Sequence, residues 1–258
     1  MYAVRRNELP QLMRTSNPAL NDQVFRGLGV ATADAMTLQG NVNKTGILLV
    51  CTVATAAWTW NRFQHSPSAE TVLPFLWGGL IGGFLVAMVT IFKKAWAPIT
   101  SPVYALLEGL VLGSVSAMLE LRFPGIAIEA VSLTFGTLLI LLLAYSSGLV
   151  RVTDKLRLGI VAATGGIAIF YLAEIVLGFF GVHFTAINGS GAIGIGFSVF
   201  VVIIASLNLV LDFDFIESGV RAGAPKYMEW YGAFGLMVTL IWLYVEILNL
   251  LSKLRNRR

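Results

Sequence analysis

The sequence predicts an all-α integral membrane protein, a bundle of seven transmembrane helices. The 258-residue chain is 57% hydrophobic and only 12% charged, whereas soluble domains carry about 25% charged residues. Its apolar residues lie in long continuous runs and not in the alternating pattern of membrane β-strands. Helices satisfy their own backbone hydrogen bonds inside lipid, so we expect each run to cross the bilayer as a helix.

Seven apolar segments follow one another with short connections, which makes neighbouring segments antiparallel. A span takes about 20 residues to cross roughly 30 Å of hydrocarbon. We expect a transmembrane domain over 46–252, preceded by a polar arm over 1–45 and followed by a basic tail over 253–258. The arm lacks the apolar core of a secretory signal peptide and is expected in the cytoplasm. The segments are 46–61, 72–92, 102–120, 126–149, 157–181, 191–213 and 231–252.

Glycines four residues apart predict close helix packing in the second and third segments. Small residues at this spacing let two backbones approach where lipid gives no hydrophobic drive for association. The pairs are Gly78 with Gly82, Gly79 with Gly83, and Gly109 with Gly113.

Lys and Arg residues predict the orientation. With the N-terminus inside, the outer loops up to the sixth span carry only Arg62 and Arg122, as the positive-inside rule requires. The tail leaves two alternatives open. Seven full spans place Lys253 and Arg255 outside, whereas a re-entrant seventh segment returns them to the cytoplasm.

Two acids inside the apolar runs are the strongest functional candidates. Asp212 closes the sixth run and Glu246 lies within the seventh. Inserting an acid at the centre of a membrane span costs about 2.5–3.5 kcal/mol of free energy, so an acid found there is taken as a functional candidate. We predict Asp212 and Glu246 as pH-sensing, gating residues. The supporting polar candidates are Glu108, Glu174, Asp214, Lys93 and Lys94; their alternative role is to cap helices, snorkel or stabilise the bundle.

Two carboxyl groups at hydrogen-bond distance would share one proton and form a neutral contact between the last two helices. Without the proton they repel, and their oxygens can contact calcium. Counting residues opposes this pairing, because Glu246 falls about 22 Å along a seventh helix that starts inside. Sequence alone leaves contact between Asp212 and Glu246 open.

The sequence contains no motif of an enzyme active site or of a cofactor-binding site. The histidines are His65 and His183, both in short connections, and Cys51 is the single cysteine. A zinc site usually needs three convergent protein ligands, so we expect no enzyme activity and no cofactor besides calcium as a bound or transported ion. The basic residues are scattered over loops and termini, which argues against nucleic-acid binding.

The chain resembles the transmembrane Bax inhibitor motif family, in its bacterial branch. The stretches that carry the resemblance are "TSNPALND", "MTLQGNVNKTGILL", "SPVYALLEGLVLGSVS", "LNLVLDFDFIESG" and "GAPKYMEWYGAFGLMVTLIWLYVEILNLL". The resemblance implies a central last helix and a pH-sensitive calcium leak, closed by acids that match Asp212 and Glu246. The chain departs from better-known members, which have Asp where Glu246 stands. Lys93 or Lys94 corresponds loosely to an Arg in some relatives.

These observations predict a channel-like calcium leak of the bacterial inner membrane, with the lipid bilayer and calcium as its partners. An alternative is a non-conducting membrane regulator that binds another membrane protein, such as a quality-control protease. A proton-coupled transporter is a third alternative, for which the sequence shows no inverted repeat.

Overall fold

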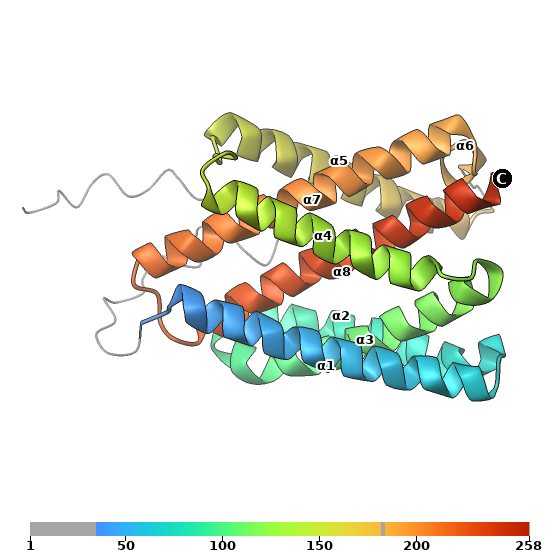
Figure 1. Cartoon of the computed structure of the whole chain (residues 1–258), viewed down its shortest axis with the longest axis horizontal. Helices are drawn as coiled ribbons and strands as arrows, with labels where there is room; N and C mark the ends of the chain where they lie inside the picture. Colours follow the sequence, from blue (N-terminus) through green and yellow to red (C-terminus); the bar gives the residue numbers. More distant parts are fainter. Residues whose placement is uncertain (1–34, 182–183, 258) are drawn as a thin grey trace, which may run out of the picture.

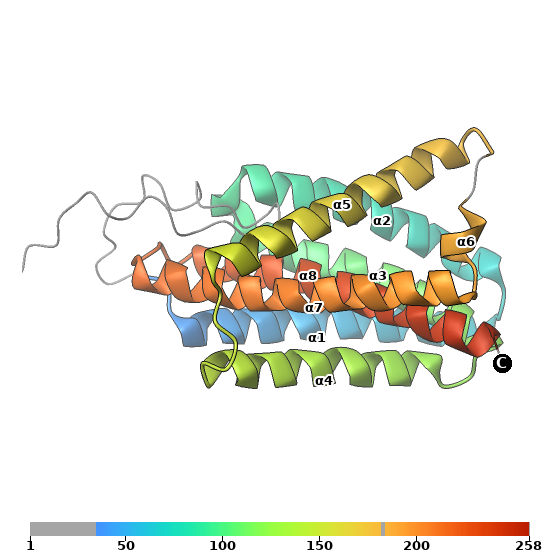
Figure 2. The same ribbon diagram turned by 90° about the horizontal axis from the view of Figure 1, so that it is seen from above.

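The computed structural model describes residues 35–181 and 184–257, and this part of the chain is almost entirely helical. Residues 1–34 of the expected arm, and His183, lie outside the described residues. Seven long helices form a bundle (Figure 1, and Figure 2 from above), together with the short elements η2 (Lys94–Trp96) and α6 (Thr185–Asn188). The long helices are α1 (Leu38–His65), α2 (Ala69–Phe92), α3 (Ala97–Arg122), α4 (Ile126–Ser146), α5 (Asp154–Gly178), α7 (Ala192–Arg221) and α8 (Met228–Asn256).

The last helix, α8, lies at the centre of the bundle. It packs against α1, α3, α4 and α7, and Figure 1 shows it crossing between α1 and α4. Its apolar residues are buried along its length, from Ala233 through Leu243 to Leu248. A helix that is apolar on all sides suits a buried position, and the central last helix that the family resemblance implied is present.

Six helices of the described chain are long and apolar enough to cross a membrane. They are α2, α3, α4, α5, α7 and α8. Helix α1 was expected as a span over 46–61 but is not one of the six. It begins at Leu38, earlier than predicted. Its inward face is polar, and this lowers the hydropathy of the helix; the buried polar residues are Asn41, Thr45, Thr52 and Thr59.

Helix α8 is one continuous helix of 29 residues. At 1.5 Å per residue it is about 43 Å long, more than the roughly 30 Å hydrocarbon core. It ends at the opposite end of the bundle from the start of α1 (Figure 1), which is not the course of a re-entrant segment. Lys253, expected in a basic tail, lies within α8 and is buried.

Glycines bring three helices close together, as their spacing predicted, with one exception. A Cβ at Gly113 would lie 2.5 Å from the Ala56 carbonyl oxygen of α1, and one at Gly79 would lie 2.7 Å from the Leu107 carbonyl oxygen of α3. Gly78 differs, because a Cβ there would meet nothing within 4 Å. Gly79 and Gly113 therefore face neighbouring helices, and Gly78 does not.

A buried carboxylate ties the start of α1 to the start of α8. Glu229 is fully buried and accepts hydrogen bonds from the Thr37 hydroxyl at 2.8 Å and from Lys44 Nζ at 2.6 Å. Lys226 Nζ lies 3.2 Å from the same carboxylate, and Asn41 Nδ2 donates to the Glu229 carbonyl at 2.9 Å. Thr37 also caps α1 by accepting from the Gly40 amide. We call Thr37, Lys44, Lys226 and Glu229 the Glu229 cluster.

Candidate functional site

The inward face of α7 carries the polar residues around which the candidate site is built. Ser198, Asn208 and Asp212 are buried, with exposed fractions of 2% or less. Their spacings of ten and four residues keep them on one side of the helix, since a helix repeats every 3.6 residues. The side chains of α5 and α8 meet this face at successive heights, as described below.

At the end of the bundle where α8 finishes, Lys253 inserts its side chain toward the start of α7. Its Nζ donates hydrogen bonds to the Ile187 carbonyl at 2.9 Å, the Ser198 hydroxyl at 2.9 Å and the Gly194 carbonyl at 3.3 Å. A buried lysine is costly unless it is hydrogen-bonded, and these three acceptors meet that need. They also fix the antiparallel register of α7 and α8.

Glu246 lies two helical turns before Lys253 on the same face of α8. Its Oε1 accepts hydrogen bonds from the Tyr171 hydroxyl of α5 at 2.8 Å and from the Trp242 indole nitrogen at 3.2 Å. Only 4% of Glu246 is exposed. The predicted burial of this acid is present, and its bonding partners are an aromatic pair that the sequence analysis did not single out.

Toward the other end of the bundle, Asn208 and Asp212 follow on α7. Asn208 Nδ2 donates to the Thr164 hydroxyl of α5 at 2.8 Å and to the Ile204 carbonyl at 2.9 Å. Asp212 lies one turn further and is fully buried. It is well inside α7, which continues for nine residues beyond it to Arg221, and not at the end of its segment as predicted.

An ion-pair cluster follows where α7 meets α4 and α5. Arg157 of α5 donates to the Asp214 carboxylate at 2.6 Å. The Tyr145 hydroxyl of α4 donates to Glu217 at 2.5 Å, and Arg221 lies 3.5 Å from Glu217. Asp214 was predicted as a supporting residue, and its partner is an arginine that neither the charge pattern nor the family resemblance indicated.

These groups form a single file that we call the polar column. The α5 members recur every seven residues, so they lie on one helix face. Along α7 the column extends from Ser198 to Glu217, about 28 Å at 1.5 Å per residue, close to the thickness of the hydrocarbon core. Its members are Lys253, Ser198, Glu246, Tyr171, Asn208, Thr164, Asp212, Asp214, Arg157, Tyr145 and Glu217.

The register separates the two predicted gating acids. Lys253 meets Gly194 and Ser198, and Glu246 is seven residues earlier on α8. In an antiparallel pair Glu246 therefore lies level with residues 201–205 of α7, which are seven to eleven residues before Asp212. That is roughly 10–16 Å along the helix. In this register each carboxyl group lies at its own height in the column.

The remaining predicted residues lie elsewhere. Glu108 is half-buried beside α2, where its carboxylate faces Gly83. Glu174 accepts a hydrogen bond from Asn188 at the opposite end of α5 from Arg157. Lys93 lies over the Trp96 ring at 4.5 Å, and Lys94 lies over the Tyr231 ring at 5.9 Å. We infer that these two lysines anchor η2 by cation–π contacts.

Of the eleven members of the polar column, only Asp212, Asp214 and Glu246 were predicted as site residues. The sequence carries a signal for four of the other eight: Arg157, Thr164, Tyr171 and Lys253. The signal that pointed to them is spacing. The three α5 residues recur every seven positions, and Lys253 follows Glu246 by the same interval. Seven residues are close to two helical turns, so each set shares a face with polar character inside an apolar helix.

No group of three or more His, Cys, Asp or Glu side chains is placed to hold a metal ion within residues 35–181 and 184–257. Asp212 and Glu246 accordingly stay predictions as calcium contacts, with carboxylate oxygens of the kind that calcium prefers.

Comparison with known proteins gives one match. The pattern described as "Bax inhibitor 1 like" matches residues 17–256, which covers all the helices and every member of the polar column. No curated protein and no solved structure matches the chain. Since the match covers more than nine-tenths of the sequence, the chain belongs to the Bax inhibitor 1-like family of membrane proteins.

Proposed function

We propose that this protein is a pH-sensitive calcium leak of the bacterial inner membrane, in which cations cross along the polar column. The observation that carries the proposal is the column itself. Four of the six candidate spans, α4, α5, α7 and α8, contribute its side chains, and it holds two buried carboxyl groups, Asp212 and Glu246. Buried acids in a membrane protein face the interior or a pathway and seldom persist without a role.

Protonation of the two acids supplies the proposed pH response. When they are neutral, α7 and α8 pack without buried negative charge between them. When they ionise, each places a negative charge in the buried interior of the bundle, which is costly to desolvate. Water and a hard cation then stabilise the ionised oxygens, because calcium takes carboxylate and water ligands. We propose that Asp212 and Glu246 act in sequence at separate heights, and that a direct bridge between them belongs to a different register.

Fixed cations border both acids. Arg157 lies toward one end of the column, and Lys253 toward the other. Arg157 is already paired with Asp214, whereas Lys253 donates to neutral oxygens. The Lys253 charge therefore opposes a permeating cation while Asp212 and Glu246 are neutral, and it is offset once they ionise. This arrangement favours a slow leak over an open pore.

Calcium flux into liposomes tests the proposal. The purified protein is reconstituted with a trapped calcium dye, and flux is measured from pH 5 to pH 8. Asp212→Asn and Glu246→Gln should each lower the flux and flatten its pH dependence, because each removes one titrating group. Glu70→Gln, at an exposed position in the first turn of α2, is the matched control and should behave as the native protein.

Unchanged flux and unchanged pH dependence in both Asp212→Asn and Glu246→Gln would contradict the proposal. Absence of flux in the native protein, with a membrane protein co-purifying in stoichiometric amount, would favour the regulator alternative. Proteins of this family are generally non-enzymatic, which is compatible with either role.

A further inference from the structure

A lateral groove runs along the bundle between α1 and α4, away from the polar column for most of its length. Both helices pack on α8, which with α7 forms the floor. Two cavities of about 740 Å³ and 390 Å³ follow one another in this groove, and Leu49 of α1 lines both. The first reaches Leu38 and the second reaches Trp60. The groove therefore follows about 33 Å of α1, which matches the thickness of the hydrocarbon core.

The walls of the groove are apolar over most of this length. They include Leu138 and Leu142 of α4 in the first cavity and Val131 and Phe135 of α4 in the second. Gly46 of α1 also lines the first cavity, and a Cβ added there would meet nothing within 4 Å. The groove is thus open space at its middle, with room for an apolar chain.

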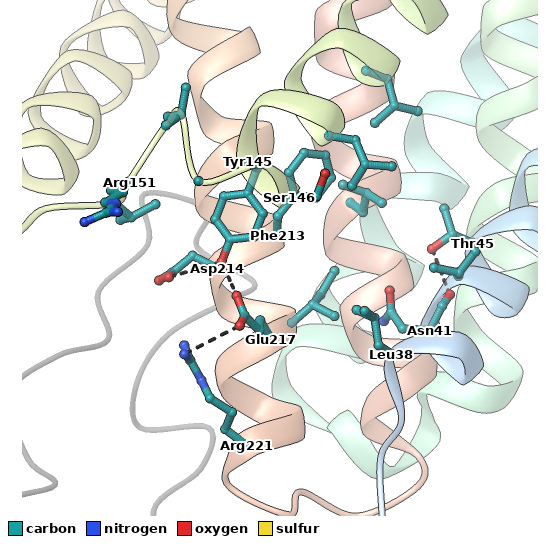
Figure 3. Close-up of a pocket in the computed structure, with 18 of the residues that line it drawn as sticks. Leu38, Asn41, Thr45, Tyr145, Ser146, Arg151, Phe213, Asp214, Glu217 and Arg221 are labelled. Atoms are coloured by element: carbon teal, nitrogen blue, oxygen red, sulfur yellow. Dashed lines mark hydrogen bonds and ion pairs between the residues drawn. The ribbon is translucent and has the colours of Figure 1, made fainter.

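Charge gathers at one mouth of the groove only. Arg151, Asp214, Glu217 and Arg221 line the first cavity at the end where α4 and α7 finish (Figure 3). Asp214 is bonded to Arg157, and Glu217 is bonded to Tyr145 and paired with Arg221. Arg151 is exposed and makes no ion pair among the residues that the structure describes. Since Arg157 neutralises Asp214 and Arg221 faces Glu217, Arg151 is the cation of this mouth that is left without an acid among the described residues.

We propose that the groove binds one anionic phospholipid, with an acyl chain along the apolar walls and the phosphate at Arg151 and Arg221. Arg151 is the uncompensated cation of the mouth. Arg221 is 62% exposed in its side chain and makes one long ion pair at 3.5 Å, so its guanidinium keeps donors for a phosphate. Arginine suits phosphate because its planar fork can bind two oxygens at once.

The size of the groove favours an acyl chain over a partner helix. A transmembrane helix about 10 Å wide and 30 Å long occupies on the order of 2400 Å³. Each cavity is several times smaller. The two ends of the groove differ in charge, and this sets the orientation of the lipid. The far cavity ends among uncharged residues, Trp60, Ser116 and Tyr244, so the phosphate lies at the other end.

Native mass spectrometry of the full chain in detergent tests the proposal. The probes are phosphatidylglycerol and phosphatidylcholine with identical acyl chains, offered together in equal amounts. We expect one tightly held lipid, with phosphatidylglycerol preferred by at least fivefold. The double variant Arg151→Gln/Arg221→Gln should lose most of this preference, since each cation near an anionic lipid is worth about fivefold in affinity. Lys155→Gln, an exposed cation at the same end that does not line the groove, should keep it.

A second pair of variants tests the groove itself. Gly46→Trp fills the open space and should displace the bound lipid of either kind; Gly46→Leu is the milder version if the larger change impairs folding. Gly78→Trp is the matched control, because Gly78 is also open to its surroundings but lies on α2. Full lipid retention in both Gly46 variants overturns the proposal, as does equal binding of the two lipids by the native chain. A native chain that holds neither lipid also overturns it, and points to residues 1–34 or a protein partner as the occupant.

Discussion

Lys253 donates a hydrogen bond from its Nζ to the Ser198 hydroxyl at 2.9 Å, joining the end of α8 to the first turns of α7. The same ammonium group also reaches the Ile187 and Gly194 carbonyls. A residue that the sequence places in a basic tail is therefore a buried cross-link between two helices. This contact sets the register of α7 against α8, and with it the heights of Asp212 and Glu246.

The register predicts that Asp212 and Glu246 contribute independently to stability. Substitutions more than about 7–10 Å apart usually add within about 0.3–0.5 kcal/mol. The double variant Asp212→Asn/Glu246→Gln should therefore change the unfolding free energy by the sum of the two single changes, at both pH 5.5 and pH 8. The measurement is reversible unfolding in mixed micelles followed by Trp fluorescence. A coupling energy above about 1 kcal/mol would instead indicate a shared proton and a different register.

Lys253→Met should destabilise the protein by about 1–3 kcal/mol. The substitution keeps most of the side-chain length but leaves the Ile187 and Gly194 carbonyls without their donor, and a buried unsatisfied group costs about that amount. The control is Arg257→Met, an exposed position just past the end of α8, which should change stability by less than about 0.5 kcal/mol. An equally small effect of Lys253→Met would mean that the ammonium group is not buried as described.

The same variant also informs the proposed leak. Removing the fixed cation at Lys253 should raise calcium flux at low pH, where the neutral acids do not offset that charge. Unchanged flux would place the ion path away from this end of the column. This readout is separate from stability and is taken at a temperature well below the unfolding transition.

The sequence predicted the helices well and the contacts poorly, for identifiable reasons. The apolar runs placed α2 to within three residues at its start and at Phe92 at its end, because lipid exposure leaves a strong hydropathy signal. The start of α1 was missed by eight residues, since its buried face carries Asn41 and Thr45, which read as polar. Burial of Asp212 and Glu246 was predicted because acids in apolar runs are conspicuous.

The partners of those acids depend on register, which hydropathy does not encode. Tyr171 is one of seven tyrosines, and nothing local marks it as the group that meets Glu246. Its contact with Glu246 can be predicted only once α5 is known to pack on α7. Glu229 was overlooked for a related reason: it lies at the very start of α8, where acids normally face water and favour the helix dipole, yet it is fully buried.

Glu229→Gln should lower the free energy of unfolding by about 3 kcal/mol. Removing one partner of a buried ion pair leaves uncompensated charge, and such losses reach about 3–5 kcal/mol. The charge left here is on Lys44, whose side chain is 20% exposed, because Lys226 is 52% exposed and remains in contact with water. Glu129→Gln is the control, because its pair with Arg255 is half-exposed and such pairs contribute about 0–1 kcal/mol. Lys44→Met in the Glu229→Gln background should recover part of the loss, since it removes a stranded charge. Equal effects of Glu229→Gln and Glu129→Gln would contradict the buried cluster.

Gly109→Ala and Gly78→Ala should change stability in opposite directions. A Cβ at Gly109 would overlap the Thr52 carbonyl and the Thr55 hydroxyl of α1, whereas one at Gly78 would meet nothing within 4 Å. Alanine is favoured over glycine within a helix by about 1 kcal/mol, so Gly78→Ala should stabilise by up to that amount. Gly109→Ala must instead push α1 away from α3 and break the hydrogen bond from Thr52 to the Ala105 carbonyl; forced overpacking costs about 1–3 kcal/mol.

Thermal unfolding of the two glycine variants in the same detergent gives the comparison directly. Gly113→Ala, four residues along the same face, should behave as Gly109→Ala because its Cβ would lie 2.5 Å from the Ala56 carbonyl oxygen. If Gly109→Ala and Gly113→Ala both raise the unfolding temperature as Gly78→Ala does, α1 does not pack on α3 at this distance. Since α1 also forms one wall of the lateral groove, that result would remove the wall from which the lipid site is built.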